Sequence, residues 1–259
     1  MVNETAEKNF TNWCYRVGIE AWAVDVDDTL CPTGPLFRNK MLQACQLISG
    51  NHGLELELCQ KTLREINDEC YRTHYVNPLR WGTVMELVAS KLDLSRKTHD
   101  EALGILMEIY NTPIKLFPDA EEFLAFITKI QFPRIAVTHA DSDWTGKKIE
   151  WLGLYRYFDP KDIHIVDMNG PKGPDEWRRA FGRRPSCYGG IGDSRLSDAR
   201  PAYEAGVEWF FLINRNTGIW NLQQDVDVKD IPGLIYIDSL RRVKELDFWH
   251  TENLVKRPE

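Results

Sequence analysis

Short apolar segments rich in β-favouring residues alternate with amphipathic helical patterns along most of the chain. The first apolar segment, residues 19–25, runs directly into acidic residues. Similar segments follow at 133–138, 163–166, 186–191, 207–212 and 234–237. Helical patterns lie between them at 118–130, 145–152, 175–181, 198–205 and 239–246. Strands that alternate with helices predict parallel β-α-β units, so we expect an α/β fold with a Rossmann-like parallel sheet and helices on both faces.

One long interval breaks this alternation. Between residues 36 and 110 the pattern is helical throughout, with helices expected near 36–49, 55–71, 79–92 and 98–110. Proline-containing linkers at 32–35 and 113–118 border the interval. We therefore predict an α/β core formed by residues 1–32 and 113–259, and an inserted all-helical cap formed by residues 33–112.

The composition of the chain limits which cellular compartment and which kinds of partner we expect. The formal net charge of −7 over 259 residues argues against a broad basic surface for nucleic acid. The six cysteines form no C-x-x-C pair, which favours a reducing compartment over a zinc site or a disulfide framework. We find no apolar leader in residues 1–18 and no apolar stretch of membrane-spanning length. The expectation is a cytoplasmic protein with neither a nucleic acid nor a membrane as partner.

The sharpest chemical pattern follows the first predicted strand. Asp25 begins an Asp-x-Asp-x-Thr sequence in which Asp27 is the second carboxylate. Two carboxylates with one residue between them project to the same side of a strand end, where they can hold Mg²⁺ or act as nucleophile and proton carrier. Two other interpretations stay open: an acidic turn that caps a helix, and the paired-aspartate metal site of sugar-nucleotide transferases.

Three further positions carry polar groups at or near strand ends. The hydroxyl of Thr138 can donate a hydrogen bond to a phosphate oxygen, although threonine is common in strands. His139 is a possible substrate contact. Lys172, in a turn before a helix, can neutralise phosphoryl oxygens, although a solvated loop lysine is equally ordinary. Asp193 can bind Mg²⁺ after a glycine-rich strand, and Asp198 can assist it, orient the lysine or cap the next helix.

These positions, in this order, resemble the haloacid dehalogenase-like (HAD) superfamily, whose motifs are Asp-x-Asp-x-Thr, a threonine or serine after a strand, a lysine, and Gly-Asp-x-x-x-Asp or a close variant. The resemblance implies Asp25 as nucleophile, Asp27 as general acid/base, and Lys172 as stabilising lysine. It implies that phosphate is bound by Thr138 and Lys172, to which we add His139 as a candidate phosphate contact. It also implies that Mg²⁺ is held by Asp25, Asp27, Asp193 and Asp198, with Asp27 acting through its backbone carbonyl. The chain departs from the family at His139, where asparagine or serine is frequent, and after Lys172, where Gly-Pro replaces proline.

The resemblance also suggests which reaction to expect. Family dehalogenases lack the second aspartate because a halide leaves without a proton, so Asp27 favours phosphate ester chemistry. We expect a Mg²⁺-dependent phosphatase that hydrolyses a small phosphorylated metabolite through an aspartyl-phosphate on Asp25. The position of the insertion matches the family's helical C1-type cap. A phosphotransferase or sugar-phosphate mutase, and a non-catalytic binding module, remain as alternatives.

Within the predicted cap, polar and aromatic residues gather in one turn between helices. They are Arg72, His74, Tyr75, Asn77, Arg80 and Trp81. This turn is either a substrate contact or a solvated connection, and its aromatic residues are either part of that contact or cap packing.

Overall fold

A single parallel sheet forms the centre of the molecule. The computed structural model describes residues 2–182, 187–215 and 226–245. Its strands are β1 (Ala21–Val24), β2 (Arg134–His139), β3 (Ile163–Val166), β4 (Tyr188–Gly192), β5 (Trp209–Ile213) and β6 (Gly233–Ile237). They form a six-stranded sheet in the order β3-β2-β1-β4-β5-β6, and every neighbouring pair is parallel. The predicted α/β fold class is therefore confirmed.

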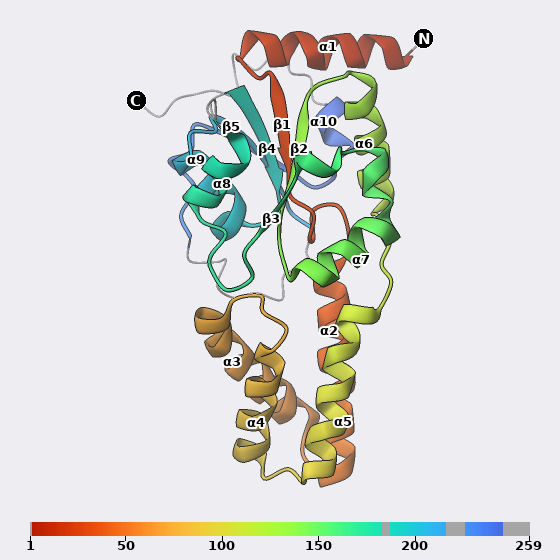
Figure 1. The fold of residues 1–259 in the computed structure, drawn as a ribbon, viewed down its shortest axis with the longest axis vertical. Helices are drawn as coiled ribbons and strands as arrows, with labels where there is room; N and C mark the ends of the chain where they lie inside the picture. The colour runs from red at the N-terminus through yellow and green to blue at the C-terminus, as the bar shows by residue number, and fades with distance from the viewer. Residues whose placement is uncertain (1, 183–186, 216–225, 246–259) are drawn as a thin grey trace.

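Helices flank the sheet on both faces, and α1 lies across the end of the sheet where β1 begins (Figure 1). They are α1 (Val2–Arg16), α6 (Pro118–Lys129), α7 (Ser142–Leu152), α8 (Pro174–Phe181), α9 (Arg200–Glu204) and α10 (Arg242–Glu245). Successive strand residues point to opposite faces. Trp22 and Val24 therefore pack with α1, α6, α7 and α10, whereas Ala23 packs with α8 and α9.

Three local features differ from the sequence prediction or limit it. Helix α1 was not anticipated, yet its Phe10 stacks on Trp22 at 5.4 Å and its Trp13 meets Trp209 edge-on at 5.4 Å. The helix expected from residue 198 begins earlier, as a short π-helical turn at Arg195–Ala199 that continues into α9. Residue 186 of a predicted strand and residue 246 of a predicted helix lie outside the described residues.

A helical insertion follows β1 and lies beyond the carboxyl ends of the strands (Figure 1). It consists of α2 (Thr33–His52), α3 (Leu56–His74), α4 (Arg80–Leu92), α5 (Arg96–Met107) and a 3₁₀ turn at Glu108–Asn111. Buried residues such as Ile48, Leu63 and Met85 give it a hydrophobic cluster of its own, into which Trp144 of α7 also packs. None of the helices in the described ranges is both long and apolar enough to cross a membrane.

Candidate active site

The predicted acidic residues meet at one edge of the sheet. Asp25 directly follows β1, and its backbone N–H donates to the carbonyl of Ile191 in the adjacent β4 at 2.9 Å. Asp193 directly follows β4. The carboxyl ends of parallel strands share one edge, where ligands of open α/β sheets bind. The strand pairing thus brings together carboxylates that are far apart in sequence.

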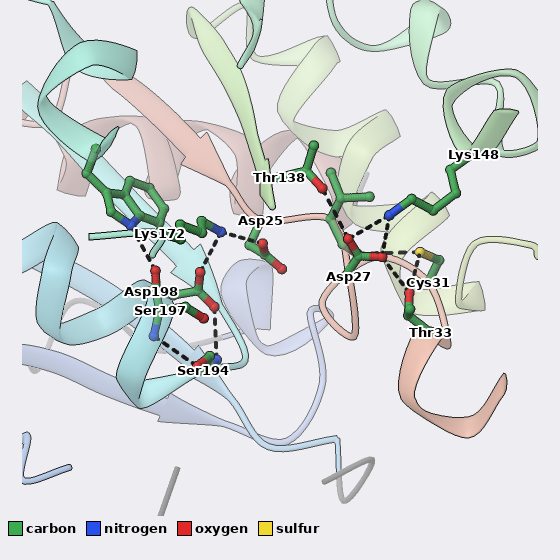
Figure 2. Close-up of polar contacts among 12 residues, drawn as sticks. Asp25, Asp27, Cys31, Thr33, Thr138, Lys148, Lys172, Ser194, Ser197 and Asp198 are labelled. Carbon is green, nitrogen blue, oxygen red and sulfur yellow. Dashed lines mark hydrogen bonds and ion pairs between the residues drawn. The ribbon is translucent and has the colours of Figure 1, made fainter. Parts of the chain in front are cut away.

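Lys172 bridges two of these carboxylates (Figure 2). Its Nζ lies 2.5 Å from Asp25 Oδ1 and 2.6 Å from Asp198 Oδ1, and its side chain is 2% exposed. Burial alone lowers the pKa of Lys172, but the two carboxylates raise it above its ordinary value. The two carboxylates therefore favour the charged form of Lys172 beside Asp25.

The carboxylates around Lys172 form a cluster suited to a divalent cation. Asp25, Asp193 and Asp198 each offer a ligand atom, and these atoms lie within 4.8 Å of one another. Burial, followed by repulsion from Asp198, raises the pKa of Asp25 to about 7 and also raises that of Asp193. Within the described residues, the buried Oδ2 of Asp25 has no hydrogen-bond partner. A buried carboxylate oxygen of this kind fits Mg²⁺, which prefers hard oxygen ligands.

Asp198 is held by protein contacts through both of its oxygens. Oδ1 contacts Lys172, and Oδ2 accepts the backbone N–H of Ser194 at 3.0 Å. Asp198 therefore orients Lys172, whereas the helical turn that contains it is capped by Ser194, whose Oγ accepts the N–H of Ser197 at 3.1 Å. Gly192 is needed beside it, because a Cβ there would lie 2.7 Å from the Asp198 side chain.

Asp27 lies in a second group of contacts (Figure 2). Lys148 Nζ lies 2.6 and 2.7 Å from its two oxygens. The hydroxyls of Thr33 and Thr138 donate to it at 2.6 and 3.1 Å. Burial would raise the pKa of Asp27, but Lys148 and both hydroxyls lower it below its ordinary value. Asp27 is therefore an ionised carboxylate in this structure.

One pocket joins the core to the helical insertion. The core contributes Asp25, Asp27, Asp28, His139, Lys172, Asp193 and Asp198 among its lining residues. The insertion contributes Thr33, Gly34, Phe37, Tyr71, Val76 and Arg80. Asp28 has a left-handed backbone (φ 57°), and its Oδ1 accepts the N–H of Gly34 at 2.7 Å. This contact fastens the start of α2 to the loop after β1.

Comparisons with known proteins rest on structure alone, because no family model and no curated protein matches the sequence. A haloacid dehalogenase-like family hydrolase from Xanthomonas campestris superposes with a TM-score of 0.70 at 18% identity, over 88% of this chain and 90% of its own. A HAD phosphatase from Thermococcus onnurineus matches with a TM-score of 0.56 at 20% identity, over 88% and 97%. The Bacillus subtilis protein YfnB, whose structure contains bound magnesium, matches with 0.62 at 18% identity, over the same shares. The chain has the HAD-like fold.

Within this HAD-like fold, two predicted phosphate contacts have protein partners. Thr138 is 1% exposed, and its hydroxyl donates to Asp27. His139 borders the pocket, and its Nε2 pairs with the carbonyl of Asp167 at 3.1 Å. Burial, and then the charge of Lys172, lower the pKa of His139 to about 4, so its ring is neutral at pH 7.

Lys148 contacts Asp27, yet the sequence prediction did not include this lysine in the site. It is fully buried, and its Nζ lies 4.1 Å from the centre of the Trp144 ring. The available signal was periodicity, because position 148 falls on the apolar stripe of α7 with Trp144, Ile149 and Leu152. A lysine on a buried stripe requires an anionic partner, and here the partner is Asp27.

Proposed function

We propose that the protein is a Mg²⁺-dependent phosphatase that hydrolyses a small phosphomonoester through an aspartyl-phosphate on Asp25. The observation that carries the proposal is the position of Asp25. One oxygen is held by Lys172, and the other is buried at a pocket without a hydrogen-bond partner among the described residues. An oriented carboxylate beside a fixed cation suits nucleophilic attack on a phosphoryl group.

The chain's own groups account for most of the proposed chemistry. Lys172 neutralises the attacking carboxylate and the phosphoryl oxygens, and Asp198 fixes the lysine. Asp25 and Asp193, with Asp198 and the Asp27 carbonyl implied by the family resemblance, would hold the metal ion. When bound, Mg²⁺ supplies further stabilisation of charge on the phosphoryl oxygens.

Asp27 is proposed as the proton carrier. Its pairing with Lys148 favours the carboxylate, which is the form that accepts a proton from the water that hydrolyses the aspartyl-phosphate. For the first step Asp27 must take up a proton from solvent, which it passes to the leaving alkoxide; the attacking water returns a proton to Asp27 in the second step. A halide needs no proton, so this second carboxylate at the pocket supports phosphate ester chemistry over dehalogenation.

The helical insertion supports a small substrate. Its residues Phe37, Tyr71 and Val76 form one wall of the pocket, so the reacting groups lie between the insertion and the sheet. A covered site excludes bulk water and large substrates. A small phosphorylated metabolite is the proposed substrate class.

Release of inorganic phosphate from p-nitrophenyl phosphate tests the proposal, with Mg²⁺ or EDTA present. Wild-type turnover should require Mg²⁺ and fall by at least about 10³-fold in Asp25→Asn, because the nucleophile is lost. Asp175→Asn, whose side chain is 82% exposed at the start of α8, is the matched control and should keep full activity. Folded wild type that releases no phosphate, or an active Asp25→Asn, would contradict the proposal.

A further inference from the structure

The turn between α3 and α4 brings a cation to the pocket. Arg80 is 1% exposed, yet it borders the pocket together with Tyr71 and Val76. Arg80 is the charged residue among the pocket-lining residues of the insertion, within the part of the chain that the structure describes. The solvated-connection interpretation of this turn is therefore wrong for Arg80, which is a buried cation beside the site.

The guanidinium of Arg80 is held in place by its neighbours. Nη1 donates to the carbonyl of Tyr75. Cζ lies 5.4 Å from the centre of the Tyr71 ring and 5.2 Å from that of Trp81. Contacts with a carbonyl and two rings fix the orientation of the planar group.

The same turn is tied to the loop that carries Lys172. Asn77 Nδ2 donates to Asn169 Oδ1 at 2.8 Å, three residues before the lysine. Burial raises the pKa of Tyr71, and the charges of Arg80, Asp198 and Lys172 all act on its hydroxyl. Tyr71 lines the pocket together with Arg80 of the insertion and with Lys172 and Asp198 of the core.

The charges around the pocket restrict where a second anion can sit. Five aspartates line the pocket: Asp25, Asp27, Asp28, Asp193 and Asp198. They repel any anionic group beyond the phosphate that Lys172 and a metal ion compensate. An additional negative charge on the substrate is therefore best compensated near Arg80, the cation that the insertion brings to the pocket.

We propose that Arg80 binds a carboxylate on the leaving group of the phosphate ester. The proposal rests on the phosphatase function above and names its substrate class as phosphorylated hydroxy acids. A planar guanidinium fork matches a carboxylate in two parallel hydrogen bonds. The charge pair is strong because both partners are removed from water.

The test compares acids with their neutral esters. The substrates are the phosphate monoesters of hydroxyacetic, hydroxypropionic and hydroxybutyric acids, each paired with its methyl ester. Wild type should prefer the acid at one or more chain lengths by at least about tenfold in kcat/KM. Arg80→Met should reduce this ratio to about one, whereas Arg80→Lys should keep part of it. Arg64→Met removes the same charge from an exposed position of α3 and should leave the ratio unchanged.

A merely structural role of Arg80 would lower all rates together without changing the ratio of acid to ester. Circular dichroism checks that each variant is folded. If Arg80→Met does not fold, the wild-type ratio still decides, because equal rates for acid and ester at every chain length overturn the proposal. A preference for the acid that persists in folded Arg80→Met also overturns it. Wild type that cleaves neither series nor p-nitrophenyl phosphate contradicts the phosphatase function itself.

Discussion

Two buried lysines flank the loop after β1, and they hold their aspartates differently. Lys172 is shared between Asp25 and Asp198, and the second oxygen of Asp25 has no hydrogen-bond partner in the described residues. Lys148 contacts both oxygens of Asp27, and Thr33 and Thr138 add hydrogen bonds. Asp25 is therefore oriented through one oxygen, whereas both oxygens of Asp27 contact protein groups.

We infer separate roles for Asp25 and Asp27, which lie two residues apart in the sequence. Around Asp25, three acids, two of them buried, lie close together and Lys172 pairs with two of them, so the group favours an additional cation. At Asp27, one lysine contacts both oxygens of one carboxylate, so this side chain already has a cationic partner. We therefore expect changes at Lys172 to affect mainly turnover, and changes at Lys148 to affect mainly the stability of the fold.

Removal of the Lys172 charge should have the largest effect. In Lys172→Met, kcat for p-nitrophenyl phosphate should fall by about 10²–10³-fold, because the fixed cation beside the nucleophile is lost. Steady-state kinetics at saturating Mg²⁺ measure it. Lys161→Met, whose side chain is 79% exposed, serves as the control. A loss below threefold would remove Lys172 from the proposed chemistry.

Removal of the Lys148 charge should have the second-largest effect, which is a loss of folding stability. Lys148→Met leaves Asp27, whose side chain is 23% exposed, without its cation and should lower the free energy of unfolding by about 3 kcal/mol. Urea denaturation measures the change. The double variant Lys148→Met/Asp27→Asn should recover part of it, because no buried charge is then left alone. Equal stability of Lys148→Met and wild type would show that the ion pair contributes little.

Metal addition should have the smallest effect, and it should depend on pH. The pKa of Asp25 is raised from 3.8 to about 7, so the metal-free folded protein binds more protons than the unfolded chain in that range. The contribution of Asp25 to stability therefore falls as pH rises from about 4 to 7. Mg²⁺ replaces the proton, so it should raise Tm by on the order of 5 °C at pH 7.5, and by less at pH 5.5.

Thermal unfolding of wild type and Asp193→Asn at both pH values tests this expectation. The variant lacks one of the carboxylates and should show a smaller Tm shift at pH 7.5. A shift of the same size in both proteins would place the metal ion away from Asp193.

Much of this architecture could be predicted because it is encoded locally. The strand Ala21–Val24 is a continuous apolar run, and Asp25 follows it directly. Lys148 could not be paired with Asp27 from sequence alone, since the contact joins residues 121 positions apart. Helix α1 was missed because its few buried aromatic residues, including Phe10 and Trp13, are recognised as core only when Trp22 and Trp209 lie beside them.

The orientation of the insertion could not be predicted either. The apolar periodicity predicts the helices of the insertion. It does not predict which helix face packs into the hydrophobic cluster of the insertion and which face borders the pocket. The polar-aromatic turn was identified as a group, yet only the fold shows that Arg80 points inward while Arg72 is exposed.

The two chain segments that lead into and out of the insertion run side by side. Phe117 N–H donates to the carbonyl of Leu30 at 2.9 Å, across 87 residues of sequence. The chain therefore leaves the sheet and returns to it at nearly one place. In evolutionary terms, the intervening helices can be lengthened, shortened or exchanged without rerouting any strand. New pocket walls can then be acquired by recombination, while the aspartates and Lys172 of the proposed site keep their places on the core.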